Sequence, residues 1–329
     1  AWRSGFLELL MQTTVALLAA GLLGLCEAFV PGSLPLAPLA RRSMCSGVSA
    51  ARIGRASTRN AARAPLLSQV AMSVEYEKLS GVQVTSVATG ETMPATSAWE
   101  KGGGKALVVL LTHFGDLTCW EYAQKLRYYL PQLEAKGVQV RMIGIGGAEA
   151  AAEFAESNSI PKELLYFDPD ASAAATLGLK PGFGRSSVQE PQANGLSPYL
   201  RLLPMLLGVG SPGTLGKVLY GYFGDRNNNP EWIPAQLKLT QKGSFPYVAP
   251  ETFATLGTGY LRPFELATVR LQNMISVLSR WDALTPDNKD LVVQQGGTLV
   301  FNGEDCVYRY DDKGILVYAP LEDVLKAVE

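Results

Sequence analysis

Hydrophobic and polar positions alternate along residues 74–329 in patterns typical of a mixed α/β domain. Residues 106–112 (ALVVLLT) and 138–145 (VQVRMIGI) are apolar runs, as expected of strands buried on both faces of a sheet. Between them, apolar residues recur at spacings of three or four and predict a helix that begins near Cys119 and ends at Gly137. The residues of its buried face are Tyr122, Leu126, Leu130 and Leu133. A strand, a helix and a strand with short connections predict a right-handed parallel crossover.

Shorter segments extend this pattern towards both ends of the chain. The further predicted elements are an edge strand at 81–89, a short strand at 164–167, and helices at 148–157, 170–178, 263–281 and 320–328. The segment GGTLVFNGEDCVYRY predicts a β-hairpin, with Asn302-Gly303 as its type I′ turn. A βαβ half followed by a β-hairpin and a final helix is the thioredoxin-like plan, an α/β fold.

A Gly- and Pro-rich region interrupts that plan, and we predict a large, partly helical insertion at about 180–290. Within it lies an apolar stretch from Tyr199 to Phe223, which Pro204, Gly208 and other Gly and Pro residues break up. Two interpretations stay open. The stretch either packs over the sheet or forms a surface that touches a membrane or a protein partner.

The first 72 residues differ in composition from the rest and predict a targeting segment. They contain seven Arg and two acidic residues. The whole chain has 29 basic and 30 acidic residues, so residues 73–329 hold 22 basic and 28 acidic ones. Residues 15–25 are an apolar run before a small-residue cleavage site, and 29–72 are rich in Arg and Ser without any acid. We expect a signal peptide at 1–28, a plastid transit peptide at 29–73 and the thioredoxin-like domain at 74–329. The alternative is one signal peptide followed by a secreted linker.

This two-part leader, with Phe29-Val30-Pro31 at its junction, resembles the plastid leaders of algae with secondary plastids. It implies import into the plastid (chloroplast) of such an alga. Cleavage there would remove Cys26 and Cys45 and leave only Cys119 and Cys306 in the mature chain.

Composition excludes several classes of chemistry. The formal net charge is −1, which does not favour nucleic-acid binding. One His and four widely spaced Cys offer no zinc-type spacing, and we expect neither a metal nor a cofactor. The apolar run in the leader is too short to span a bilayer well, and we expect no transmembrane span in the mature chain.

The chemistry is expected where a buried strand ends and a helix begins, at His113–Glu121 (HFGDLTCWE). Thr118 and Glu121 fit a capping box, with Thr118 as N-cap and Cys119 as the first helical residue. The helix dipole there lowers the pKa of a thiol, whereas the charges of Asp116 and Glu121 raise it, and the sequence leaves the balance open. The candidate site residues are therefore Cys119, Asp116, His113 and Thr118. For each, a structural role, such as packing or capping, is the alternative.

The segment HFGDLTCWE resembles the turn of the peroxiredoxin-like 2 group of the alkyl hydroperoxide reductase/thiol-specific antioxidant (AhpC/TSA) family, where a CxxC follows a similar HFG. The resemblance extends over most of residues 105–329 and indicates the cyanobacterial and chloroplast branch. Its other blocks are Tyr166-Phe-Asp168-Pro169, Leu177-Gly178-Leu179, Gly210–Thr214, Gly221–Arg226, Arg262–Thr268 and Gln295–Thr298.

The sequence departs from this group at the first cysteine of the CxxC, where Asp116 stands. A disulfide cycle within the motif is therefore impossible. The resemblance implies an antioxidant protein that reduces a peroxide through Cys119, with a reducing thiol protein as partner and Arg185, Arg226 or Arg262 as donor to the peroxide. The alternative is a non-catalytic binding or assembly module with a plastid protein partner, sensitive to charges at Leu206 or Leu207. Two lesser hypotheses are Cys306 as a resolving thiol and Gly144–Gly147 as a phosphate-binding turn.

Overall fold

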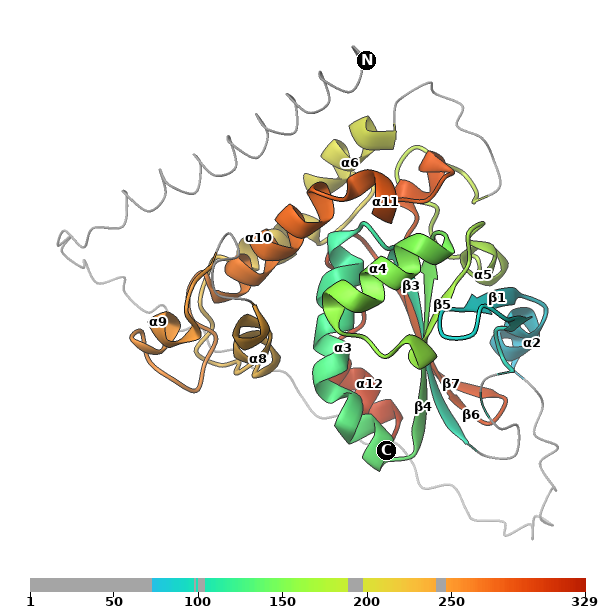
Figure 1. The fold of residues 1–329 in the computed structure, drawn as a ribbon, viewed down its shortest axis with the longest axis horizontal. Coiled ribbons are helices and arrows are strands. Elements are labelled where there is room, and N and C mark those ends of the chain that lie inside the picture. The colour runs from blue at the N-terminus through green and yellow to red at the C-terminus, as the bar shows by residue number, and fades with distance from the viewer. Residues whose placement is uncertain (1–72, 98, 100–103, 189–197, 241–246) are drawn as a thin grey trace, which may run out of the picture. The chain divides into compact units, whose positions relative to one another are not determined.

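The computed structural model describes residues 73–97, 99, 104–188, 198–240 and 247–329. Their strands form one mixed sheet in the order β2-β1-β5-β4-β3-β6-β7 (Figure 1). The strands are β1 (Gln83–Ser86), β2 (Thr92–Pro94), β3 (Lys105–His113), β4 (Val138–Ile145), β5 (Leu165–Phe167), β6 (Gly297–Asn302) and β7 (Asp305–Asp311). β3, β4 and β5 are parallel, and the hairpin β6–β7 joins β3 through antiparallel pairing with β6. The predicted thioredoxin-like α/β fold is confirmed.

Two predictions about the sheet are wrong in detail. Residues 81–89 do not form its edge, because β1 lies between β5 and β2. The edge is β2, a three-residue strand that has too little alternation to be recognised in the sequence. The hairpin turn lies one residue later than expected, at Gly303-Glu304, because Asn302 still pairs with Asp305. Gly303 takes the positive φ that this turn requires.

Helices cover both faces of the sheet, as the continuous apolar strands predict. α3 (Leu117–Ala135), α4 (Ala148–Asn158) and α12 (Leu321–Ala327) lie on one face, and α2 (Val74–Ser80) and α5 (Ser172–Leu177) on the other. Successive residues of β3 alternate between the two cores: Leu107 and Val109 face α3, whereas Val108 and Leu110 face α5. The predicted apolar face of α3 is confirmed, since Tyr122, Leu126, Leu130 and Leu133 are all buried.

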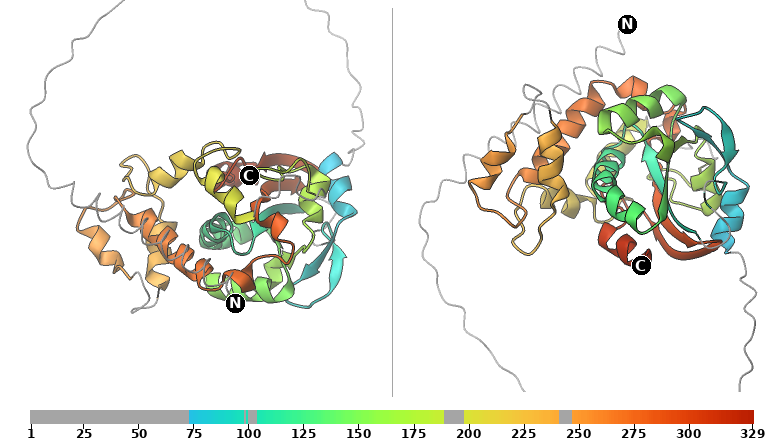
Figure 2. Two further views of the ribbon diagram at one scale, coloured as in Figure 1. Left: turned by 90° about the horizontal axis from the view of Figure 1, so that it is seen from above. Right: turned by 60° about the horizontal axis from the view of Figure 1, so that its bottom comes forward.

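The region between the two halves is helical, and part of it packs against the outer face of α3. Its elements are α6 (Pro198–Leu206), α7 (Thr214–Tyr220), α8 (Trp232–Leu239), α9 (Pro250–Ala254), α10 (Glu265–Leu278), α11 (Trp281–Leu284) and a 3₁₀-helix, η2 (Lys289–Val293). The predicted long helix at 263–281 is thus α10, which ends at Leu278 and is followed by α11. Both views in Figure 2 show α8 and α10 on the side of α3 that faces away from the sheet, whereas α11 packs against α4 and η2 contacts β3.

The contact between α3 and α10 is polar although it is buried. Gln124 and Asn273 exchange two amide hydrogen bonds of 2.8 and 2.9 Å, and Gln124 donates a third to Asn158. One helical turn earlier in each helix, Glu121 meets Arg270. The first half of α3 is therefore buried on both sides, against the sheet through apolar residues and against α10 through polar ones.

The apolar stretch of the insertion remains partly exposed. Leu203, Leu206, Leu207 and Val209 expose 43–72% of their surface, whereas Met205 is fully buried against η2 and the segment before α12. In the part of the chain that the structure describes, no helix has the length and apolar character needed to cross a bilayer.

Candidate functional site

The turn between β3 and α3 places the four predicted site residues at the C-terminal end of the parallel strands. α3 begins two residues earlier than predicted, with Asp116 as its N-cap. The Asp116 side chain caps no helical N–H but accepts a 2.7 Å hydrogen bond from the Thr112 hydroxyl. Thr118 is not the N-cap, so the predicted capping box is wrong. Its hydroxyl instead accepts a 3.0 Å hydrogen bond from the backbone N–H of Leu316.

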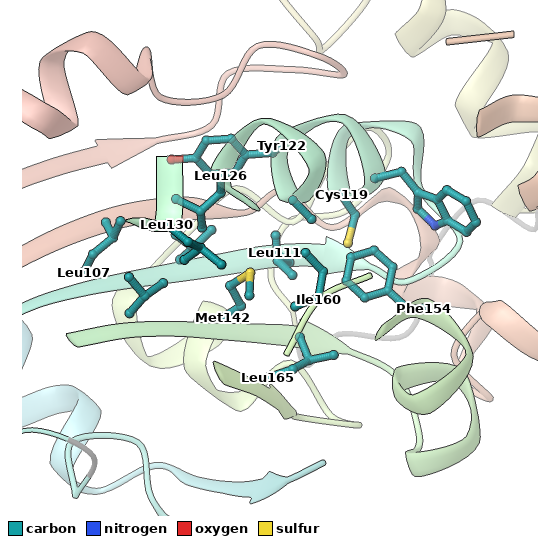
Figure 3. Packing of buried hydrophobic residues seen from close by; sticks show 14 of the residues in the cluster. Leu107, Leu111, Cys119, Tyr122, Leu126, Leu130, Met142, Phe154, Ile160 and Leu165 are labelled. Carbon is teal, nitrogen blue, oxygen red and sulfur yellow. The ribbon is translucent and has the colours of Figure 1, made fainter. Parts of the chain in front are cut away.

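Cys119 lies in the third position of α3 and points into the core. Figure 3 shows its sulfur directed towards Phe154 and the apolar side chains above the sheet. Only 1% of its surface is exposed. Burial raises the pKa of the Cys119 thiol well above its ordinary value, and the charge of Asp116 raises it further. The helix dipole therefore does not decide the state of this thiol, which stays protonated at neutral pH.

His113 is the last residue of β3 and is also buried. Its Nδ1 accepts a 3.1 Å hydrogen bond from the Gly115 N–H. Its ring and that of Trp281 are in an edge-to-face arrangement, with their centroids 5.9 Å apart. Burial lowers the pKa of His113 to about 4, although the charge of Asp116 opposes this. The imidazole is neutral at neutral pH, and it holds the turn rather than facing solvent.

Sequence reasoning missed Asp312, which joins Asp116 at this end of the strands. β3 is antiparallel to β6 and β6 is antiparallel to β7, so β7 runs in the direction of β3. The residue after β7 and the residues after β3 therefore lie at the same end of the sheet. Burial, together with the charges of Asp116 and Asp311, raises the pKa of Asp312 well above its ordinary value. One of its carboxyl oxygens has no hydrogen-bond partner within the described residues. Its position directly after the hairpin strand was the signal available in the sequence.

The glycines of Gly144–Gly147 make room for Phe114. A Cβ on Gly144 would lie 2.3 Å from the Phe114 ring, and one on Gly146 2.8 Å from it. The ring packs 5.2 Å from that of Phe154. This packing explains the glycine-rich turn, and the phosphate-binding interpretation gains no support from the structure.

Cys306 is too far from Cys119 in the fold to act as its resolving thiol. Cys119 belongs to the core beneath α3, whereas Cys306 packs against the core on the opposite face of the sheet. Both thiols are free. Burial, followed by the charge of Glu75, raises the pKa of Cys306 to about 11.

The three arginines considered as peroxide donors are engaged elsewhere. Arg185 donates to the backbone oxygens of Asp290 and Val188, and Arg262 pairs with Glu265. The guanidinium of Arg226 lies 5.0 Å from the ring of Tyr260. The chemistry at the start of α3 therefore has no cationic donor among these candidates.

A charged network two residues beyond Cys119 was also missed. Arg270 of α10 binds Glu121 through two hydrogen bonds of 2.5 and 3.0 Å, and the Tyr318 hydroxyl donates a third of 2.7 Å. Burial favours a raised pKa for Glu121, but the charge and hydrogen bonds of Arg270, with that of Tyr318, outweigh it and lower the pKa. The polar residues Glu121 and Gln124, spaced by three on a helix, would ordinarily indicate a solvent-exposed face, which hid this contact.

The sheet order and the crossover through α3 define a thioredoxin-like protein. The family model described as AhpC/TSA antioxidant enzyme matches residues 125–314, more than half of the chain, and the protein therefore belongs to that family. The match begins after the turn that holds Asp116 and Cys119.

Comparison with curated proteins finds no match, and comparison with solved structures finds none either. Among the residues that the structure describes, no group of three or more His, Cys, Asp or Glu side chains is arranged to hold a metal ion.

Proposed function

We propose that this member of the AhpC/TSA family is a plastid protein that acts by binding, and that it does not reduce peroxides through Cys119. The observation that carries this proposal is the burial of the Cys119 thiol, of which 1% is exposed. Peroxide reduction requires a thiolate that reaches an O–O bond, releases an alcohol or water and becomes a sulfenic acid. A buried, protonated thiol beside the charge of Asp116 meets neither requirement.

Thiol chemistry tests this proposal directly. The full-length chain is mixed with hydrogen peroxide and a reducing thiol protein, and peroxide consumption is followed. We expect no consumption above the background, and no difference between wild type, Cys119→Ser and Cys306→Ser. Consumption that Cys119→Ser abolishes and Cys306→Ser preserves would establish the peroxidase activity that family membership suggests, and would overturn the proposal.

The plastid location rests on residues 1–72, which lie outside the described residues, as do Cys26 and Cys45. Their support is compositional: an apolar run, then an acid-free stretch with six Arg. A fluorescent protein fused behind residues 1–72 is expected to enter the plastid of an alga with secondary plastids. Residues 1–28 alone are expected to direct it only into the secretory pathway. Secretion of the longer fusion would contradict the transit peptide and favour the single signal peptide.

A plastid protein partner is the second part of this proposal, and the exposed leucines in α6 and directly after it support it. Leu207 exposes 72% of its surface. Placing a charge there, as in Leu207→Glu, is expected to weaken co-purification of such a partner from plastid extract, while Cys119→Ser leaves it unchanged. Leu239→Glu on α8, also exposed, is the matched control. Equal recovery with both glutamate variants would exclude this surface.

A further inference from the structure

A cavity of about 330 Å³ lies between α3 and the insertion, outside the turn that holds Cys119. α3 contributes Glu121 and Lys125 to its wall, α7 and α10 contribute Lys217 and Arg270, and the segment before α12 contributes Leu316 and Tyr318. The volume is at the lower end of the range typical of small-molecule sites. Because the thioredoxin-like body and the insertion both line it, the cavity exists only where the two are packed together.

The polar wall of this cavity is fixed in place. Two nitrogens of the Arg270 guanidinium bind Glu121, and a third donates a 2.6 Å hydrogen bond to the backbone oxygen of Lys217. A Cβ on Gly221 would lie 2.7 Å from that third nitrogen, so a larger residue there would displace this end of the guanidinium. Five N–H groups belong to a guanidinium, and these contacts use three. Two further N–H groups, one on each terminal nitrogen, take no part in these bonds.

The wall holds three cations and two carboxylates, and Lys217 shares the charge of Glu322 with Lys125 without contacting it. Glu121 balances Arg270, and Glu322 lies 3.3 Å from Lys125. The Lys217 ammonium takes part in no hydrogen bond or ion pair within the described residues, and it is exposed. The cavity thus carries a net charge of one positive unit on a flexible side chain, beside fixed donors.

Apart from Tyr220 and Asn228, the rest of the wall is largely apolar. Trp232 and Ile233 of α8, Leu266 of α10 and Leu316 line it, and all four are buried. A ligand that fits both parts has one anionic group and a short apolar body. We infer that this cavity binds a small organic carboxylate, with its anionic group between Lys217 and Arg270 and its apolar part against Leu266 and Ile233.

This inference rests on the proposal that the protein acts by binding, and its test is independent of thiol chemistry. Hexanoate is the probe, hexanamide its neutral counterpart, and inorganic phosphate the anion without an apolar body. Binding to the full-length chain is followed by saturation-transfer NMR, with Kd on the order of 1 mM for a ligand of this size. Lys217→Met removes the cation of the wall that makes no hydrogen bond or ion pair within the described residues. Lys238→Met, at an exposed lysine of α8 outside the cavity, is the matched control.

We expect hexanoate to bind at least five-fold more tightly than hexanamide or phosphate, and Lys217→Met to weaken it about five-fold while Lys238→Met does not. Equal binding of hexanoate and hexanamide, equal binding of hexanoate and phosphate, or an unchanged Kd in Lys217→Met would each overturn the inference. An inert Cys119 together with absent hexanoate binding would refute the ligand class and leave the proposed function standing. Peroxide turnover through Cys119 would refute the proposed function, whatever hexanoate does.

Discussion

Cys119 and Glu121 are two residues apart on α3, yet they face different surroundings. The thiol points to the sheet, is sealed by apolar side chains and has a raised pKa. The carboxylate points to the insertion, keeps its charge and helps to line a cavity. In a thioredoxin-like fold the start of this helix is the expected place for chemistry, but here the polar side chains of its first turns, Glu121 among them, lie on the other face. The fold class alone therefore does not distinguish between these two faces of α3.

The strongest test of this contrast is to remove the charge from the cavity wall. Glu121→Ala leaves Arg270 buried without its partner, and we expect the free energy of unfolding to fall by about 3–5 kcal/mol. Urea unfolding measures it. The matched control is Glu329→Ala, which removes the exposed partner of Lys136 and should cost less than about 1 kcal/mol. Equal costs for the two variants would mean that the Glu121–Arg270 pair is not structural.

The burial of His113 in the turn should make the free energy of unfolding fall at acidic pH. The folded pKa of His113, about 4, lies below its unfolded value of 6.5, so the unfolded chain binds more protons between these values. Stability contributed by neutral His113 is complete above pH 6.5 and is lost as the pH falls to about 4, a loss of about 3 kcal/mol.

His113→Asn keeps an acceptor for the Gly115 N–H and removes the titration, so it should lose less stability between pH 7 and 4 than wild type does. Because the chain has one histidine, a single imidazole NMR signal reports its pKa. Titration of that signal near 6.5 would show that the turn is open to water.

Asp312 should have the opposite pH dependence. Its folded pKa is raised, so the folded state binds more protons above the unfolded pKa of about 3.9, and stability is lost as the pH rises. We expect the unfolding free energy of Asp312→Asn to gain on that of wild type as the pH rises above the unfolded pKa. Asp311→Asn, at a more exposed carboxylate paired with Arg309, is the control. A difference that does not change with pH would show that Asp312 is ionised.

The smallest effect concerns the link between α3 and the segment before α12. Thr118→Val keeps the shape of the side chain but leaves the buried Leu316 N–H without an acceptor, at a cost of about 1–2 kcal/mol. Thr118→Ser retains the hydroxyl and should cost less. Alkylation of Cys119 measures the same link, and should be faster in Thr118→Val than in Thr118→Ser. Equal alkylation rates would show that this hydrogen bond does not keep the thiol closed.

The elements with strong patterns could be predicted from the sequence. The apolar runs of β3 and β4 and the spacing from Tyr122 to Leu133 identified the parallel core, and the hairpin and last helix completed the fold class. These predictions succeeded because elements buried against a sheet need apolar residues at regular spacings, and such spacings can be recognised in the sequence.

The start of α3 and the cavity could not be predicted in the same way. Thr118 and Glu121 fit a capping box, but tertiary contacts with Leu316 and Arg270 hold both side chains. The cavity depends on a pairing between residues 149 positions apart, and no local pattern records such a distance. The burial of Cys119, likewise, follows from packing against Phe154 and the sheet rather than from its place near a helix start.

The long separation between Glu121 and Arg270 also bears on how the chain folds. β3 is completed on one side by β6, whose residue Asn302 pairs with Lys105, and α3 is completed by α10. An N-terminal fragment that contains β3 and α3 therefore has an unpaired strand edge and an uncompensated charge until the last third of the chain arrives. Contacts of such sequence separation slow folding and expose aggregation-prone surfaces. We expect this protein to rely on chaperones until its C-terminal hairpin has been synthesised or translocated.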